Sequence, residues 1–329
     1  MILQLIVPHW KEVASEVEPL LNSIAIQQSI DFRDIGVLIV YDGEEATRLP
    51  EMDWVIKYPF EIRHLHKKHG GISETRNYGL DHAMAPYIMF CDADDMFCHV
   101  CALRMVLDQI EKGFDTMTSA FIEETRNPET GAPLYVVHEQ DCTFVHGKVH
   151  RTEFLRENGL RFCDRLQVHE DSYFNILVQS TVEEGKGKYF PEKFYLWKWR
   201  DNSICRHDRD YILKTFPAML DSNDALVDEL ERRGLNHHAN IHTGLMVMEA
   251  YYTLNKKEWL EKTHADYREK TEQRFKEYFT KHKSKWDALT DAEIMKASAI
   301  VRERSVRGGM LMESIAFPTW LENIMRKGA

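Results

Sequence analysis

Long apolar runs, cysteine and a leader-like amino terminus are scarce or missing in this sequence of 329 residues. No stretch approaches the roughly 18 consecutive apolar residues that a membrane-spanning helix needs, so no transmembrane segment is expected. The run Met1–Pro8 lacks a basic region and is too short for a signal peptide. Six cysteines do not suggest a disulfide framework, and Cys98 and Cys101 have no second CxxC to complete a zinc site. These absences predict a cytoplasmic protein.

Positive charge is also in short supply, and it is unevenly spread along the chain. The 42 lysines and arginines are outnumbered by 53 acidic residues, for a formal net charge of −11. From Lys256 onward, 16 basic and 12 acidic residues give +4, so the first 255 residues carry −15. The acidic body argues against wholesale nucleic-acid binding and leaves the basic tail as a candidate polyanion contact.

The amino-terminal part alternates between buried strands and helices. Apolar runs predict strands at Ile2–Val7, Ile35–Tyr41 and Tyr87–Cys91, and alternation predicts a shorter strand at Glu61–His66. Helices are expected at Pro19–Gln28, with Pro19 in the first turn, and at Ser73–Ala85, with Ser73 as N-cap. This alternation predicts an α/β doubly wound sheet, in which ligands bind beyond the carboxyl ends of the strands. Asp42 and the run Asp92–Asp95 fall at such ends.

Beyond residue 115 the pattern changes twice. Short β runs at 115–121, 134–138 and 194–199 mix with helices at 152–158 and 171–180. From residue 209 nearly everything is typical of helix, in segments near 209–233, 237–254, 258–282, 291–305 and 310–326. We therefore expect two parts, 1–208 and a helical 209–329.

The run Asp92-Ala93-Asp94-Asp95 concentrates negative charge at one strand end. Carboxylates this close together repel one another unless something positive lies among them, and a divalent cation with oxygen ligands relieves that repulsion. The alternative is an acidic turn that caps the following helix. The preceding strand favours the cation, because it places the run where ligands bind in such sheets.

Two other segments carry candidate chemistry. The glycine-rich turn His69-Gly70-Gly71 leads into a helix with Arg76 near its start, an arrangement suited to an anion. Glu170 and Asp171 open an amphipathic helix, and beside a metal cluster one of them becomes a candidate general base. The alternatives are a surface ion pair for Arg76 and compensation of the helix dipole by the two acids.

Taken in order, these segments resemble a known family. Family 2 glycosyltransferases of the GT-A fold show the same succession of motifs: Pro8 after a buried strand, Val40-Tyr41-Asp42-Gly43, the segment 71–80, the run 90–95 and Glu170-Asp171. The stretch 146–162 also resembles the segment before the Glu-Asp pair of these enzymes. The resemblance covers roughly residues 1–205, and the whole chain looks similar to glycosyltransferases encoded in tailed-phage genomes.

The resemblance implies a GT-A (Rossmann-like) doubly wound mixed sheet followed by a helical C-terminal subdomain. Nucleotide-sugar binding would fall in 1–98, acceptor binding and catalysis in 99–208, and the helical subdomain in 209–329. Asp42 would hydrogen-bond the uracil ring, with Pro8 at the edge of the pocket and Arg76 near the nucleotide or its diphosphate. Tyr41 stands where the family usually has a first acid, which leaves Asp42 as the base reader.

The resemblance also implies a metal and a catalytic base. Asp92 and Asp94 match the DxD motif, with Asp92 toward the ribose or metal and Asp94 as the direct Mn²⁺ or Mg²⁺ ligand. Asp171, beside Glu170, matches the catalytic base.

Four further residues match less regular positions of the family. His207 falls where some relatives place a metal-bound histidine, and Arg200 and Ser203 fall where others touch the diphosphate. Lys148 is a candidate contact of the donor sugar or its phosphates. We interpret Cys142, His146 and His150 as structural.

The predicted function is inverting transfer of a sugar from a UDP-sugar to an acceptor hydroxyl. The acceptor is open between a glycan, a protein and a hydroxymethylated DNA base of a phage, in which case the enzyme would work in the host cytoplasm. A non-catalytic nucleotide-sugar-binding module is the alternative from another class, although all the expected acids are present. The oligomeric state stays open.

Overall fold

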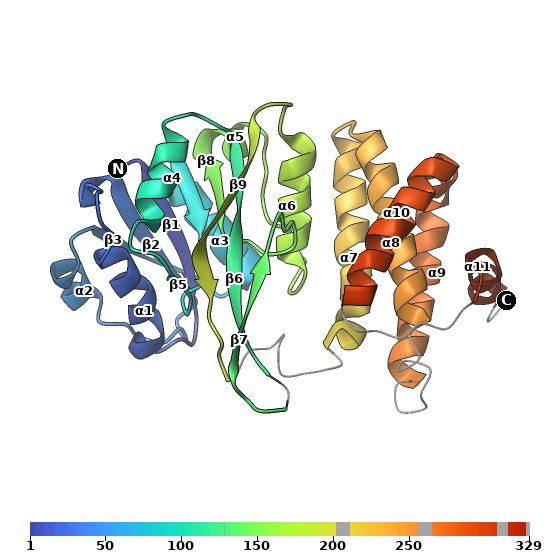
Figure 1. Cartoon of the computed structure of the whole chain (residues 1–329), viewed down its shortest axis with the longest axis horizontal. Coiled ribbons are helices and arrows are strands. Elements are labelled where there is room, and N and C mark those ends of the chain that lie inside the picture. The colour runs from blue at the N-terminus through green and yellow to red at the C-terminus, as the bar shows by residue number, and fades with distance from the viewer. Residues whose placement is uncertain (128, 202–210, 256–264, 308–314, 327–329) are drawn as a thin grey trace. The chain divides into compact units, whose positions relative to one another are not determined.

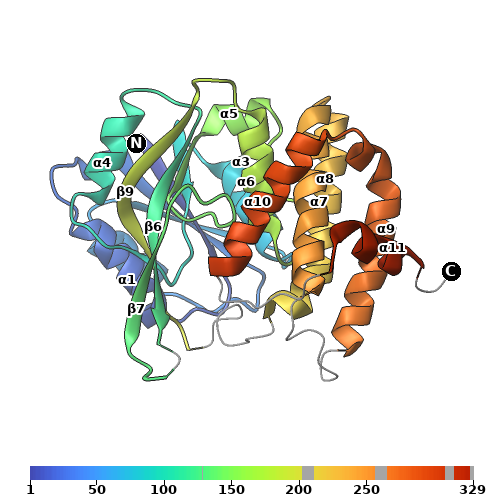
Figure 2. The ribbon, with the colours of Figure 1, turned by 45° about the vertical axis from the view of Figure 1, so that its right-hand side comes forward.

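The computed structural model describes residues 1–127, 129–201, 211–255, 265–307 and 315–326 (Figure 1). The chain divides into two compact units, Met1–His207 and Asp208–Ala329. The first unit contains a mixed sheet with helices on both faces, and the described part of the second consists of helices (Figure 2). This architecture confirms the predicted α/β sheet followed by a helical region. The expected boundary at 208/209 lies outside the described residues.

The sheet joins a parallel half to a mixed half. Its strands are β1 (Leu3–His9), β2 (Ile35–Asp42), β3 (Glu61–Lys67), β4 (Tyr87–Phe90), β5 (Met96–Phe97), β6 (Thr116–Arg126), β7 (Pro133–His138), β8 (Lys148–Arg151) and β9 (Gly187–Trp197). They lie in the order β3-β2-β1-β4-β8-β6-β9-β5, and β7 pairs with β6. The first four strands of that order are parallel, and β8 is antiparallel to β4. The carboxyl ends of β2 and β4 therefore lie at the same edge of the sheet.

Helices cover both faces of this sheet. They are α1 (Ala14–Ala25), η1 (Phe32–Asp34), α2 (Glu51–Lys57), α3 (Ile72–His82), α4 (Ala102–Ile110), α5 (Thr152–Glu157) and α6 (Glu170–Thr181). Leu5 and Val7 belong to the core under α1 and α4, whereas Ile6, between them, points at α3. A Cβ added at Gly79 would lie 2.4 Å from the Ile6 side chain, so this glycine lets α3 pack closely on β1.

Several predicted boundaries were wrong. The first helix begins at Ala14, where Glu16 accepts a hydrogen bond from the Val13 amide at 2.9 Å, so Pro19 lies inside the helix rather than in its first turn. The N-cap of α3 is Gly71, and the Ser73 hydroxyl instead donates to the Leu166 carbonyl at 3.1 Å. Strands β6 and β9 are longer than expected, and α2, α4 and β8 were not predicted.

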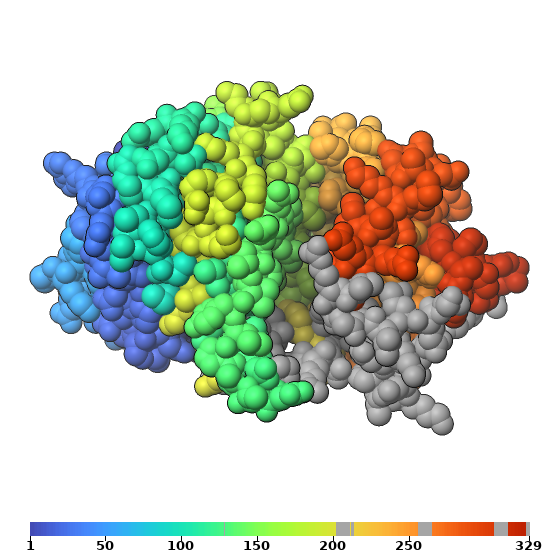
Figure 3. All heavy atoms as spheres, viewed as in Figure 1, coloured from blue at the N-terminus to red at the C-terminus, as the bar shows by residue number. Residues whose placement is uncertain are grey.

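Strand β7 lies at the surface of the amino-terminal unit. It pairs with the second half of β6, and its side chains from Leu134 to Val137 are exposed (Figure 3). The loop that follows β7 turns back toward β8 and passes beside α6, where the Asn175 amide donates to the Phe144 carbonyl at 2.9 Å. This loop therefore connects the exposed strand to the interior of the sheet.

The carboxy-terminal unit has its own core. Its helices are α7 (Tyr211–Arg232), α8 (Asn236–Leu254), α9 (Ala265–Asp287), α10 (Asp291–Arg307) and α11 (Phe317–Arg326). Phe216, Val247, Phe275, Val301 and Trp320 pack together from these five helices. Asp224 of α7 accepts hydrogen bonds from Arg274 and Lys281 of α9, which tie the two helices together. None of the helices in the described ranges is long and apolar enough to cross a membrane.

Candidate active site

Strand β2 ends at Asp42, whose buried carboxylate organises the loop that leads into α3. Its Oδ1 accepts hydrogen bonds from Lys67 Nζ at 2.8 Å and from the Gly70 amide at 2.9 Å. Its Oδ2 accepts from the Gly71 amide at 2.9 Å and lies 2.9 Å from His69 Nδ1. Burial opposes ionisation of Asp42, but these donors outweigh it and lower its pKa. Gly71 has φ +87°, a left-handed conformation that glycine adopts readily.

Strand β4 leads into the acidic run, where Asp92 and Asp94 take different partners. Asp92 Oδ1 accepts from Arg76 Nη2 at 3.1 Å, and Asp94 Oδ2 accepts from Arg200 Nη1 at 3.0 Å. The side chains of Asp92 and Asp94 keep 30% and 27% of their surface exposed, so both remain open to a ligand. Burial and the neighbouring charge of Asp92 raise the pKa of Asp94 despite the guanidinium beside it.

The third acid of the run, Asp95, points into the protein. It accepts hydrogen bonds from the Tyr195 hydroxyl at 2.7 Å and from the Lys198 amide at 3.0 Å. The ring of His146 stacks on Tyr195, and its Nδ1 lies 3.6 Å from Asp95 Oδ2. Burial and the charges of Asp94 and Asp92 raise the pKa of Asp95 well above its usual value. Sequence reasoning missed this group because no local pattern links His146 and Tyr195 to a strand end far away in the chain.

Arg76 joins the acidic run to the two acids that open α6. It is only 3% exposed, and its guanidinium lies over the Phe162 ring at 5.2 Å. Nη1 donates to Glu170 Oε1 at 2.9 Å and to Asp171 Oδ1 at 2.5 Å. Burial raises the pKa of Asp171 well above its usual value, and Arg76 opposes that effect. The predicted base and the predicted DxD motif thus share one guanidinium.

Arg200, just after β9, is a second arginine that contacts several carboxylates. Besides Asp94, its guanidinium lies 3.3 Å from Glu12, in the loop after β1, and 3.3 Å from Glu16, in α1. Burial opposes ionisation of Glu12, but hydrogen bonds from His9 and from the backbone lower its pKa to about 2. Each of the two arginines is therefore surrounded by three carboxylates.

The site has the donors that a divalent cation requires. Ligand atoms of Asp92, Asp95 and His146 all lie within 4.8 Å of one another, close enough to share one ion. Carboxylate oxygens suit Mg²⁺ and Mn²⁺, and an imidazole suits several transition metals. Six carboxylates around two arginines also leave an excess of acidic groups, which favours a cation. Asp94 is not part of the three-residue group and pairs with Arg200 instead.

Four other predicted site residues complete the description. Pro8 is buried in β1, opposite Val40 of β2. Lys148 is 2% exposed, its Nζ donates to the Phe144 carbonyl, and burial lowers its pKa. Ser203 and His207 lie outside the described residues.

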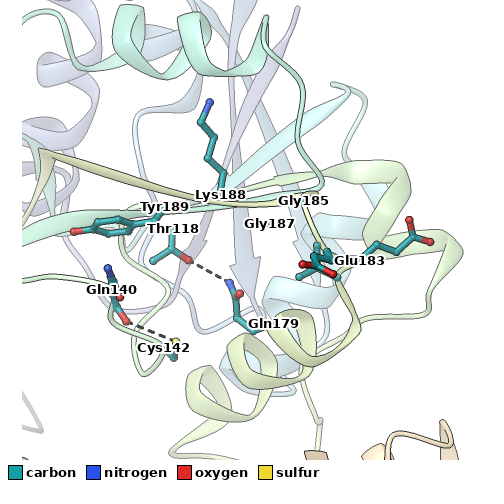
Figure 4. Close-up of a pocket in the computed structure, with 11 residues that line it drawn as sticks. Thr118, Gln140, Cys142, Gln179, Glu183, Gly185, Gly187, Lys188 and Tyr189 are labelled. Atoms are coloured by element: carbon teal, nitrogen blue, oxygen red, sulfur yellow. Dashed lines mark hydrogen bonds between the residues drawn. The ribbon is translucent and has the colours of Figure 1, made fainter.

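A separate hollow of about 430 Å³ lies beside the carboxyl end of α6 (Figure 4). Thr118 of β6 and Gln179 of α6 meet there, with a hydrogen bond of 3.3 Å from Gln179 Nε2 to Thr118 Oγ1. Gln140, Cys142 and Tyr189 also line it. None of the predicted site residues lines it, and Glu170 and Asp171 lie at the opposite, amino-terminal end of α6.

Comparison with known proteins shows what this chain is similar to. Residues 4–162 match the family described as Glycosyl transferase family 2. An uncharacterized glycosyltransferase, EpsJ of Bacillus subtilis, is 24% identical over 221 residues, which cover 62% of each chain. The minor teichoic acid biosynthesis protein GgaB, from the same organism, is 38% identical over 72 residues, or 22% of this chain and 8% of GgaB. The matched regions thus span less than two thirds of these relatives.

Solved structures agree with the fold. The crystal structure of S. aureus TarS 1–349 superposes with a TM-score of 0.64 at 16% identity, covering 94% of this chain and 92% of that one. The same fragment in complex with UDP-GlcNAc has a TM-score of 0.59 at 17% identity, with the same coverage. At such identity the likeness shows the fold alone. Residues 4–162 thus resemble family 2 glycosyltransferases, and the amino-terminal unit has the GT-A-like α/β fold of these solved structures.

Proposed function

We propose that this protein is an inverting, metal-dependent glycosyltransferase that moves a sugar from a UDP-sugar to an acceptor hydroxyl. The observation that carries the proposal is that Asp92, after β4, and the two acids of α6 pair with the single guanidinium of Arg76. Such a site places a candidate metal ligand and a candidate base on either side of one arginine. The complex of TarS with UDP-GlcNAc, a protein of the same fold, supports the choice of donor.

In this proposal the uracil ring binds at the end of β2, beside Pro8. Asp42 already holds four donors, which fill its oxygens, so the ring N–H needs one of them to leave. His69 is the partner suited to leave, because its side chain is 55% exposed, whereas that of Lys67 is 8% exposed. Asp42 then keeps the loop in place while it reads the base.

The diphosphate and its cation are proposed to bind at the end of β4. Asp94, with Asp92 beside it, would hold the ion, because both side chains are open to solvent while Asp95 is engaged by Tyr195 and Lys198. When bound, a divalent cation supplies positive charge that stabilises the departing diphosphate. Arg200 would then donate to a phosphate oxygen instead of to Asp94. Ser203 and His207 remain proposed contacts of the diphosphate and the ion.

The chemical step is a single displacement. Asp171, with Glu170 beside it, takes the proton from the acceptor hydroxyl, whose oxygen attacks the anomeric carbon. The bond from that carbon to the phosphate oxygen breaks, and UDP leaves with the electron pair, so the anomeric centre is inverted. For Lys148 to touch the donor, its Nζ would have to leave the Phe144 carbonyl.

A hydroxyl of a cell-envelope polymer is the acceptor class that we favour. The supporting observation is the match with GgaB, which is named for teichoic acid biosynthesis. The match covers 8% of GgaB, and the acceptor class is therefore part of the proposal.

The test is release of UDP from a panel of UDP-sugars, with and without Mn²⁺, with no acceptor added. The expected result is slow hydrolysis of one donor by the wild type, which is lost without the ion and in Asp94→Asn. Asp81→Asn is the matched control, since Asp81 pairs with Arg161 on the surface. Equal release in Asp94→Asn would overturn the metal assignment. Failure of UDP to bind in the presence of Mn²⁺ would overturn the function.

A further inference from the structure

Arg76 holds a different position from the one expected for a contact of the nucleotide. It sits in the second turn of α3, with its guanidinium over the Phe162 ring and 3% of the residue exposed. A diphosphate is a large, charged, hydrated group, and a side chain that binds it needs surface at the opening of the site. The guanidinium of Arg76 instead faces inward, toward carboxylates of its own chain.

The two terminal nitrogens of Arg76 donate hydrogen bonds to two different parts of the site. Nη2 donates to Asp92 Oδ1 at 3.1 Å, on the donor side, and Nη1 donates to Glu170 and Asp171, on the acceptor side. A guanidinium is planar and rigid, so its two ends keep a fixed separation. Arg76 therefore sets the distance between Asp92 and Asp171.

Each oxygen of the Asp171 carboxylate accepts a hydrogen bond from a different part of the chain. Oδ1 accepts from Arg76, and the Val145 amide approaches Oδ2 at 3.4 Å. Val145 belongs to the loop that Asn175, one turn further along α6, holds through the Thr143 and Phe144 carbonyls. The orientation of Asp171 thus depends on one long-range ion pair and one loop.

We propose that Arg76 is a positioning residue, which fixes the Asp171 carboxylate relative to Asp92 and does not contact the diphosphate. This assignment rests on the proposed function, because it takes Asp171 as the base. Lysine would keep the charge of Arg76 but cannot bridge both sides with a rigid fork. A displacement of about 1 Å in a reacting group can cost on the order of a hundredfold in rate, so a lysine here should slow the chemical step.

The experiment compares Arg76→Lys with wild type in binding and in turnover. Calorimetry measures the affinities for UDP and for uridine in the presence of Mn²⁺. Turnover is the hydrolysis of the donor found with the panel above. Positioning predicts UDP and uridine affinities within about threefold of wild type, an unchanged donor KM and a kcat lowered roughly a hundredfold. Arg161→Lys, the same change in an exposed pair with Asp81, is the control and should change none of these.

Two outcomes would overturn the proposal. A tenfold loss of UDP affinity with uridine affinity preserved would place Arg76 on the diphosphate. Turnover and affinities that both match wild type would leave Arg76 without the proposed role. Thermal unfolding of each variant separates these outcomes from a loss of the fold.

A double-mutant cycle tests whether Arg76 acts through Asp171. If it does, Arg76→Lys should lower the residual turnover of Asp171→Asn by less than about twofold, because the group that it positions is already gone. A further hundredfold loss in that background would contradict the proposal.

Phe162→Leu provides a second route if Arg76→Lys does not fold. It removes the ring beneath the guanidinium and leaves every charge in place. The expected result is a several-fold drop in kcat with UDP affinity unchanged, and no drop in kcat would contradict the proposal. Failure of the proposed function looks different: Asp171→Asn would then retain full turnover, whatever the result at Arg76.

Discussion

The ends of β2 and β4 lie at one edge of the same sheet, yet they treat buried carboxylates in opposite ways. At the end of β2 a single acid, Asp42, is surrounded by donors, two of them backbone amides of the next loop. At the end of β4 three acids lie within four residues, and two of them share their arginines with other carboxylates. The pKa of Asp42 is lowered, whereas those of Asp94 and Asp95 are raised.

We interpret the difference as one between a carboxylate whose charge the protein itself satisfies and carboxylates that leave room for a cation. Burial opposes ionisation at both strand ends, so burial alone does not decide the direction of the pKa shift. Donors supplied by the protein stabilise Asp42 as an anion, and its loop is organised in return. The acids after β4 have more negative charge around them than the protein neutralises, which leaves a place for a cation to bring stability.

The largest effect on turnover should come from Asp171→Asn. Asp171 lies in α6 and is linked through Arg76 to Asp92 at the end of β4. Loss of a general base costs about a hundredfold to ten-thousandfold in rate, so we expect kcat to fall by on the order of a thousandfold. The donor KM should stay within about threefold, because Asp171 does not bind the donor in the proposed mechanism. Steady-state UDP release measures both constants, with Asp81→Asn as control. A KM that rises while kcat is kept would move Asp171 out of the base role.

Arg200→Gln should make the Asp94 carboxylate more available to a cation, because it removes the guanidinium that donates to it. Arg200 Nη1 donates to this carboxylate, so it would compete with a cation for the same oxygens. Hydrogen bonds to charged groups contribute about 1.5–3 kcal/mol, so without Arg200 the affinity for Mn²⁺ alone should rise roughly tenfold. The affinity for UDP should fall, since Arg200 is a proposed phosphate contact. Titration of Mn²⁺ followed by electron paramagnetic resonance measures the first change. An unchanged or weaker affinity for Mn²⁺ would contradict the competition.

Asp42→Asn should lower the stability of the protein, because it removes the negative charge that Lys67 and two backbone amides stabilise. The change leaves the ammonium of Lys67 without its nearest carboxylate, with Glu74 still 3.7 Å away, and we expect it to lower the free energy of unfolding by about 1–3 kcal/mol near neutral pH. Because the folded pKa of Asp42 lies below its unfolded value of about 4, this stability is present above pH 4 and is lost as the pH falls through the folded pKa. Urea unfolding at several pH values measures the difference. A deficit that grows toward acid pH would contradict the assignment.

His69→Ala should have the smallest effect. His69 is the exposed partner of Asp42, and its removal opens the oxygen that the uracil N–H is proposed to take. Uridine affinity should therefore stay within about twofold of wild type or rise. Calorimetry measures it beside Asp42→Asn, for which we expect weaker uridine binding. A tenfold loss on removal of His69 would mean that the imidazole itself contacts the nucleoside.

Local sequence patterns predicted the frame of the site well. Three apolar runs and one alternating segment predict the parallel strands, and the positions of Asp42 and of the acidic run follow from where two of those runs stop. The acids that open α6 were found in the same way. Each of these features depends on residues that are neighbours in the chain, where periodicity and turn residues carry the information.

What the sequence could not predict depends on contacts between distant residues. Arg76 meets Asp171 across 95 positions, and Tyr195 meets Asp95 across 100. No local pattern distinguishes an arginine that faces a ligand from one that is buried among carboxylates. The sequence favours Pro19 in the first turn of α1, whereas in the structure Glu16 fixes the helix start through the Val13 amide. Tertiary contacts outweigh local preference in both cases.

The most direct test of this account is the binding of Mn²⁺ measured by electron paramagnetic resonance, with and without UDP, in wild type and in Asp94→Asn. We expect weak binding of Mn²⁺ alone, much tighter binding when UDP is present, and loss of that gain in Asp94→Asn. Binding of Mn²⁺ that is indifferent to both UDP and Asp94 would contradict it, because the end of β4 would then not be where the cation and the diphosphate meet.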